Sequence, residues 1–154
     1  MTLTLTILGS GSSAGVPRPA LGWGACDPNN PKNRRRRCSL LVERTSDAGT
    51  TRIVIDTSPD LREQLIDANV DHIEAVFLTH EHADQTHGID DLRSVVLHQR
   101  RRIPVYFNQA TGKDMLSRFP IASSRRRAAT IRRSSISIRS RPARAAPSKA
   151  RAAR

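Results

Sequence analysis

The chain has few of the residues that stabilise small secreted proteins or membrane proteins. Only two of its 154 residues are Cys, and nothing indicates an oxidising compartment, so a disulfide between Cys26 and Cys38 has no support. The amino terminus has neither a basic region nor a long apolar run, so we expect no signal peptide, no membrane contact and a cytoplasmic location. Aromatic residues make up 3% of the chain, which leaves little material for a large core.

Acidic residues are missing from the last part of the chain. Residues 120–154 hold eleven Lys or Arg and no Asp, Glu, His or Cys, whereas residues 1–119 hold fifteen basic and fourteen acidic residues. The formal net charge of +12 therefore comes almost entirely from the tail. Such a segment buries too little apolar surface to offset its ordering entropy. We therefore predict a domain over residues 1–119 and a disordered basic tail over residues 120–154.

Three interpretations of this tail are open. It could bind RNA or another polyanion through its phosphates, but without sequence specificity, because it has no aromatic side chain for base stacking. It could be an ordinary solvated tail. It could also be an unselected segment, because GC-rich coding DNA read out of frame tends to give such an Arg, Ala, Ser and Pro bias. We favour this third interpretation.

Three of the five His residues fall within one short stretch. The apolar run 75–78 ends directly before residues 79–88, so a buried strand would deliver these side chains together at its carboxyl end. His80, His82 and Asp84 alternate and share one side of a near-extended chain. Imidazole and carboxylate are ligands that zinc prefers, and a bound dication can lower the pKa of its water to about 7. A His-rich polar loop is the alternative, and we favour the metal site.

This stretch resembles the H-x-H-x-D-H hallmark of the metallo-β-lactamase superfamily. His80, His82 and Asp84 match it position for position, whereas Gln85 stands where the family has a second His. The resemblance implies that His80, His82 and Asp84 bind zinc or manganese, with one or two divalent ions per site. It also implies that Asp84 is catalytic, because it helps to orient or deprotonate the attacking water. His87 is the nearest replacement for the missing imidazole and completes the predicted metal ligands.

Further motifs narrow the resemblance. Residues 8–17 look like the first-strand loop shared by phosphoribosyl cyclic phosphate phosphodiesterases and tRNA 3′-processing endonucleases. Residues 34–39, 55–60 and 88–93 look like the phosphodiesterase side of that branch. The implied function is metal-dependent hydrolysis of a small phosphodiester. The alternatives are a tRNA 3′-processing endonuclease, or a catalytically inactive remnant that binds polyanions non-specifically.

The resemblance implies an α/β fold, a four-layer αββα sandwich made of two similar halves. Residues 1–119 would form the first half, which leaves one sheet face without its partner as an exposed apolar patch with an aggregation risk. Relatives complete a two-metal site with downstream His and Asp residues, but residues 115–154 contain no His, Asp, Glu or Cys. We therefore expect an incomplete enzyme that holds one metal weakly and turns over phosphodiesters poorly.

The hydrophobic pattern predicts alternating strands and helices. Strands are expected over residues 2–9, which alternate strictly, and over residues 38–43, 52–56, 75–78 and 103–107, with a turn at residues 47–49. Helices are expected to begin at Ser58, with Leu61, Leu65 and Ile66 on one side, and at Asp90. Thr111 is expected to cap the last helix.

Two further features have two interpretations each. Asp56, at a strand end, either orients the loop that carries the metal ligands, as the resemblance implies, or satisfies nearby backbone donors. The basic run 34–37 either contacts a phosphorylated substrate or is a solvated strand entry, and we favour the second.

Overall fold

A single mixed sheet forms the centre of the computed structural model, which describes residues 1–119 and the strand at residues 129–131. The strand order follows the sequence. The first three strands, β1 (Thr2–Gly9), β2 (Ser39–Ser46) and β3 (Gly49–Ile55), are antiparallel. The next three, β4 (Ala75–Phe77), β5 (Ile103–Tyr106) and β6 (Ala129–Ile131), continue the sheet in parallel from β3.

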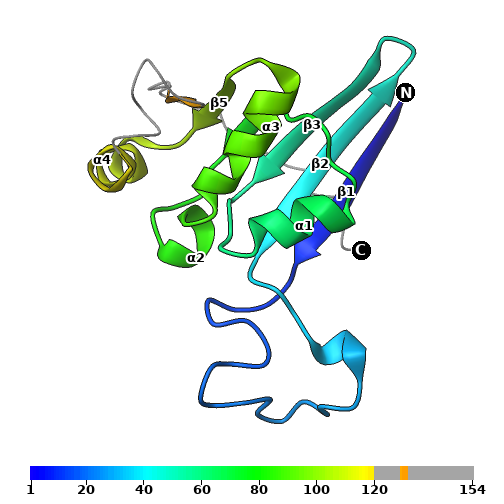
Figure 1. Ribbon diagram of the computed structural model, residues 1–154, viewed down its shortest axis with the longest axis vertical. Coiled ribbons are helices and arrows are strands. Elements are labelled where there is room, and N and C mark those ends of the chain that lie inside the picture. Colours follow the sequence, from blue (N-terminus) through cyan, green and yellow to red (C-terminus); the bar gives the residue numbers. More distant parts are fainter. Residues whose placement is uncertain (120–128, 132–154) are drawn as a thin grey trace, which may run out of the picture.

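Helices connect the parallel strands and cover one face of the sheet (Figure 1). They are α1 (Leu61–Asp67), α2 (Ala83–Thr86), α3 (Leu92–Gln99) and α4 (Gln109–Arg118), with the short 3-10 helices η1 (Pro31–Asn33) and η2 (Ile89–Asp91). Because β3, β4 and β5 run in parallel, the loops after β3 and β4 leave from the same edge of the sheet. The α/β class predicted from the sequence is confirmed.

The core lies between the sheet and helices α1 and α3. One side chain from each of β2 to β5 faces it in register, namely Leu41, Val54, Val76 and Val105, and all four are buried. The helices contribute a matching set: Leu61 and Leu65 from α1, with Leu92, Val95 and Val96 from α3. The apolar positions of the strands and those of the helices therefore form one buried layer, as their separate periodicities predict.

The strand at residues 2–9 forms as predicted, but its apolar side faces away from the core. Leu3, Leu5 and Ile7 are between 62% and 71% exposed. Leu8 packs against the core instead. In register, Ile7 begins a row of apolar residues on the outer sheet face, which continues through Leu40, Ile55, Phe77 and Tyr106. Ile7 is exposed and the other four are half-buried, so the exposed apolar patch expected from the sequence is present in part.

Two details of the helices differ from the sequence-based predictions. Ile66 was expected beside Leu61 and Leu65 but is 53% exposed, because it is rotated by roughly 100° from Leu65 around α1. Asn108, rather than Thr111, caps α4, and its side chain accepts a hydrogen bond from the Thr111 backbone N–H at 2.9 Å. Among the described residues, no helix is long and apolar enough to cross a membrane.

The predicted tail is described only in part. Residues 129–131 form β6 and pair in parallel with β5, so this portion of the tail departs from the expected disorder. Residues 120–128 and 132–154 lie outside the described residues, and the prediction for them stays a prediction.

A long loop, residues 10–38, connects the end of β1 to the start of β2 and extends away from the sheet (Figure 1). Its two ends are tied by backbone hydrogen bonds. Gly11 N–H donates to the Arg36 carbonyl at 2.7 Å, and Val16 and Arg35 exchange two bonds of 2.9 Å. Cys26 and Cys38 are both free thiols.

Candidate functional site

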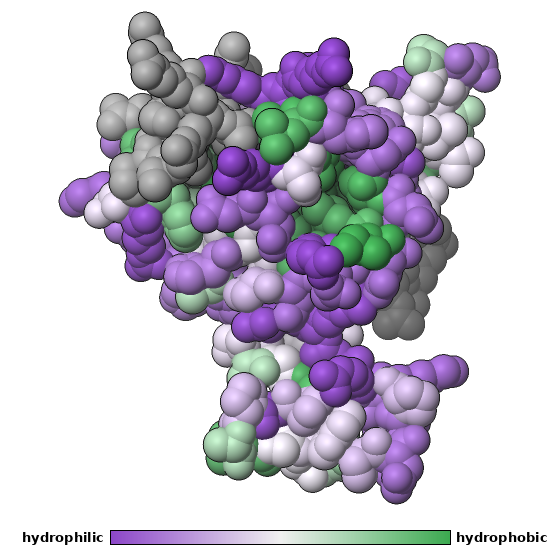
Figure 2. Space-filling model, viewed as in Figure 1, coloured by the Kyte–Doolittle hydropathy of each residue, from purple (hydrophilic) through white to green (hydrophobic). Residues whose placement is uncertain are grey.

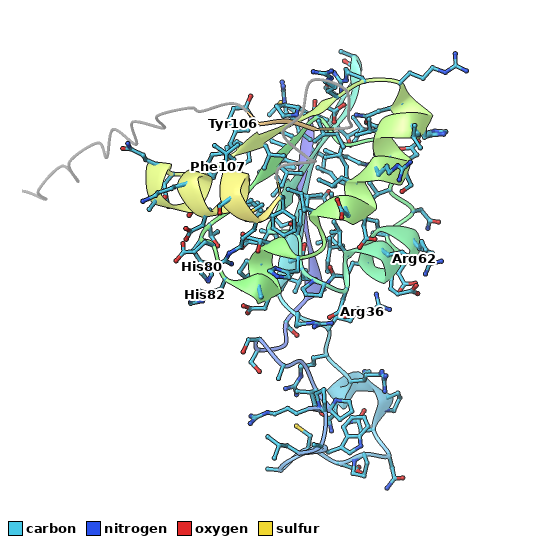
Figure 3. The ribbon with its side chains drawn as sticks, turned by 60° about the vertical axis from the view of Figure 1, so that its left-hand side comes forward. Arg36, Arg62, His80, His82, Tyr106 and Phe107 are labelled. Carbon is cyan, nitrogen blue, oxygen red and sulfur yellow. The ribbon has the colours of Figure 1, made fainter. Side chains whose placement is uncertain are left out.

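The His-containing loop leaves the carboxyl end of β4, as the sequence predicts. His80 and His82 lie together at this edge of the sheet (Figure 3). Their rings meet edge to face with centroids 4.6 Å apart, which follows from their spacing of two along a near-extended loop. His80 is half-buried and His82 is exposed. The loop therefore offers two imidazoles side by side at the surface.

Asp56 fixes the beginning of this loop. It follows β3, is only 5% exposed, and adopts a left-handed backbone conformation with φ of +62°. Its carboxylate accepts the Thr79 backbone N–H at 2.8 Å and the Thr79 hydroxyl at 2.8 and 3.0 Å. Asp56 was expected either to orient the His loop or to satisfy nearby backbone donors. It does both, because its bond to the Thr79 backbone N–H is what positions the loop.

The same contact selects a tautomer of His80. Thr79 Oγ1 lies 2.9 Å from His80 Nδ1. A hydroxyl has one proton, and Thr79 gives it to Asp56, so Oγ1 can only accept from His80 Nδ1–H. The lone pair of the neutral ring is then on Nε2, where it is available to a ligand.

Burial raises the pKa of Asp56, and the hydrogen bonds from Thr79 oppose that rise. The negative charge of Asp84 raises the pKa of Asp56 further, whereas His80 lowers it. The charge of Asp84 therefore disfavours the ionised form of Asp56, and a cation near the two carboxylates would relieve their repulsion.

Asp84 departs from the expected alternation with His80 and His82. The chain turns into helix α2 directly after His82, so Asp84 lies in the first helical turn. It is half-buried and accepts a hydrogen bond from Gln85 Nε2 at 3.2 Å. Its charge also raises the pKa of Arg37, after the larger effect of a hydrogen bond from Arg37 to Asp60.

Gln85 is 8% exposed, and its Oε1 is a buried oxygen without a hydrogen-bond partner among the described residues. An acceptor left in this state costs about 1–3 kcal/mol. His87 follows α2, and its ring packs edge-on against Phe119 with centroids 5.5 Å apart. Its role as a replacement metal ligand stays a prediction.

Helix α2 is anchored to the loop after β3 by contacts that sequence reasoning missed. Thr57 N–H donates to the Gln85 carbonyl at 2.8 Å, and Gly88 N–H donates to the Thr57 carbonyl at 2.9 Å. A Cβ at Gly88 would lie 1.9 Å from the Ser58 carbonyl oxygen, so only glycine allows this approach. On the other side, Arg118 of α4 donates to the Glu81 carbonyl at 2.9 Å.

An ion pair adjoins the motif carboxylate. Arg37 Nε and Nη2 donate to the two carboxylate oxygens of Asp60 at 2.9 and 2.6 Å, and the Arg37 backbone N–H donates to the same group at 2.8 Å. These bonds hold the pKa of Asp60 below its usual value. The sequence motif 34–37 gave the signal for a cation here, but not for its partner.

The donor set fits a divalent cation chemically but does not form a complete centre. Two imidazoles and a carboxylate are suitable ligands for one ion. However, no group of three or more His, Cys, Asp or Glu side chains is arranged to hold a metal within the part of the chain that the structure describes. The orphaned Gln85 oxygen is a poorer zinc ligand than the imidazole that it replaces in the motif.

The chain resembles one protein family and several known proteins. Residues 51–152 match the family described as "Beta-lactamase superfamily domain". A crystal structure of a diphosphatase from the PhnP family is 36% identical, with a TM-score of 0.69 over 78% of this chain and 47% of that chain. Human tRNase Z, short form, is 18% identical, with a TM-score of 0.47 over 78% of this chain and 40% of that chain.

A curated relative is the octanoyltransferase of Porphyromonas gingivalis (strain ATCC BAA-308 / W83), which is 45% identical over 103 residues. This match covers 67% of the chain but 20% of that protein. The chain thus spans about half the length of the diphosphatase and a fifth of the length of the octanoyltransferase.

Proposed function

Since the chain belongs to the β-lactamase superfamily, we propose that it is a metal-dependent hydrolase domain. Its substrate is a small phosphodiester or diphosphate. The observation that carries the proposal is the His80–His82 pair, held at the carboxyl end of β4 by the Asp56–Thr79 contact. The 36% identity to a PhnP-family diphosphatase supports phosphorus as the reacting centre.

His80, His82 and Asp84 would hold the ion. A bound divalent cation would provide an activated water at neutral pH and polarise the phosphoryl oxygens. Thr79 keeps the His80 Nε2 lone pair available by accepting from Nδ1–H, and Asp56 keeps Thr79 in place. Asp84, whose carboxylate accepts a hydrogen bond from the Gln85 amide, would accept a proton at this loop.

We expect the binding to be weak and limited to one ion. Gln85 offers an amide in place of an imidazole, and the His87 ring packs on Phe119. Turnover should be correspondingly low, because loss of a single group that stabilises the transition state can reduce the rate by about 10²–10³. The domain is in this respect an incomplete form of the hydrolase site.

Metal content tests the proposal directly. The purified chain, incubated with zinc or manganese and desalted, should retain up to one ion by elemental analysis. His80→Ala with His82→Ala should abolish retention, because both imidazoles are removed, whereas His98→Ala, an exposed His on α3, should not change it. Equal metal content in all three proteins would contradict the assignment.

Hydrolysis of bis(p-nitrophenyl) phosphate tests the expected deficit. The chain should show at most slow, metal-dependent release of p-nitrophenol, and Asp84→Ala should remove it. Rapid turnover that Asp84→Ala abolishes would show that the site is complete after all. Turnover that survives Asp84→Ala would exclude this loop as its origin.

A further inference from the structure

A polar hollow lies at the end of the sheet that carries the His loop, where residues 10–38 join the rest of the domain. Its volume is about 430 Å³. It is lined by residues 7–10 at the end of β1, by Pro31, Lys32, Arg34, Arg35 and Arg36, and by Asp67 of α1. Figure 3 shows Arg36 at this junction. Because β1 ends and β2 begins at this edge, the hollow shares the sheet end that carries the His loop.

Cations dominate the lining of the hollow. Four of its side chains are basic and one, Asp67, is acidic. Asp67 pairs with Arg36 at 2.5 Å, yet the Arg36 side chain remains 38% exposed. The side chains of Lys32 and Arg34 form no hydrogen bond or ion pair with any described residue. A hollow with an excess of one charge focuses its field and attracts counter-charged ligands.

The backbone that carries these cations is fixed by hydrogen bonds before any ligand arrives. Arg35 exchanges two hydrogen bonds with Val16, and the Arg36 carbonyl accepts from Gly11 N–H. A Cβ at Gly9 would lie 2.0 Å from the Arg37 carbonyl oxygen, so β1 and the basic segment are in direct backbone contact. A binding surface that is already ordered loses less entropy when it binds.

The basic segment continues from the hollow into an ion pair. Arg37 directly follows the lining residues and donates to both carboxylate oxygens of Asp60. Asp60 directly precedes α1, the helix whose Asp67 lines the hollow. The segment 34–37 therefore begins in the hollow and ends at the start of α1, at the sheet end that also carries the His loop.

We propose that the hollow binds a phosphate group of the substrate other than the one attacked at the His loop. This inference rests on the proposed function and names a subsite for its substrate. The volume is within the range of small-molecule pockets, about 300–1,000 Å³. The lining has no aromatic residue, so it offers no platform for the bases of RNA. Of the two interpretations of residues 34–37, the proposal adopts contact with a phosphorylated substrate.

Binding of inorganic pyrophosphate to the whole chain tests the inference, by isothermal titration in low salt with EDTA present. Lys32→Glu with Arg34→Glu reverses two charges whose side chains form no ion pair within the described residues, so the fold should persist by circular dichroism. Loss of two charged hydrogen-bond donors should lower affinity by about tenfold or more. The matched control, Arg126→Glu with Arg127→Glu, makes the same change of charge in residues 120–154 and should leave affinity within about twofold.

Each outcome supports or overturns the inference. Equal losses in both charge-reversed proteins would mean general attraction to a basic chain, and absence of pyrophosphate binding to the wild type would also overturn the subsite. Dependence of single-stranded RNA binding, but not of pyrophosphate binding, on Lys32 and Arg34 would assign the hollow to RNA instead. Pyrophosphate binding that survives His80→Ala with His82→Ala, in a chain that retains no metal even as wild type, would refute the proposed function while leaving the subsite intact.

Discussion

Replacing Asp56 by Asn asks whether a buried charge or only the shape of the side chain holds the His loop. Asn tolerates the left-handed φ of +62°, so the substitution adds no backbone strain. It keeps one oxygen for the Thr79 backbone N–H. The second oxygen becomes an NH₂ group facing the Thr79 hydroxyl, which must then reorient and can no longer accept freely from His80 Nδ1–H.

The magnitude follows from these contacts. A hydrogen bond to a charged acceptor contributes about 1.5–3 kcal/mol. Burial already disfavours ionised Asp56, as its raised pKa shows, and removal of the charge recovers part of the loss. We therefore expect the free energy of unfolding of Asp56→Asn to fall by only about 1–2 kcal/mol. Zinc affinity should fall by more, about 10–100-fold, because the His80 ring loses the partner that fixes its tautomer.

Two measurements on the same proteins separate these effects. Zinc affinity is measured by competition with a chromophoric chelator, and the free energy of unfolding by urea denaturation. Thr79→Val should reproduce the loss of affinity and Thr79→Ser should restore most of it, since Ser keeps the hydroxyl. In the double variant Asp56→Asn with Thr79→Val, the losses should not add. Unchanged zinc affinity in Asp56→Asn, or additive losses, would refute the coupling of the two residues to the site.

Three further predictions concern stability and association. Gly88→Ala should lower the free energy of unfolding, measured by urea denaturation, by about 3 kcal/mol, because the new Cβ would lie 1.9 Å from the Ser58 carbonyl oxygen. The control Gly22→Ala should lower it by only about 1 kcal/mol, because a Cβ there meets nothing within 4 Å. A hydrogen bond from the His72 ring to a β3 carbonyl raises the pKa of His72 above 6.5. The stabilising contribution of this bond is full below pH 6.5 and is lost as pH rises through the raised pKa. The free energy of unfolding should therefore fall as pH rises above 6.5, and fall less in His72→Gln; identical slopes in the two proteins would contradict this. Ile7, which is 71% exposed on β1, should promote association, so light scattering should give a smaller mass for Ile7→Lys than for the wild type at the same concentration, and equal masses would place the association elsewhere.

The sequence is informative about the strands because their patterns are local. Each pattern spans only a few consecutive residues: the alternation in β1, the apolar run of β4 and the turn between β2 and β3. Each of these elements forms where it is predicted. The His80–His82 pair was predictable for the same reason, since a spacing of two in an extended loop fixes which side chains meet.

The contacts that support the site join residues far apart in the chain. Asp56 and Thr79 are 23 residues apart, as are Arg37 and Asp60. No periodicity relates such pairs, so the sequence shows the candidate residues but not their partners. Helix α2 was missed for another reason: its four residues, Ala83–Thr86, are too few to show a helical period, and the helix moves Asp84 out of the phase that an extended chain would give.

The charges at this edge of the sheet separate into two groups that suit a cation and an anion respectively. The charge of Asp84 raises the pKa of Asp56, and Arg37 is committed to Asp60 by three hydrogen bonds. A divalent ion beside Asp84 would therefore meet uncompensated negative charge. The hollow beside β1 has the opposite imbalance, because Asp67 offsets only one of its four cations. A phosphorylated ligand has what both places lack: it can carry a metal ion at one phosphate and expose a second phosphate to the basic lining.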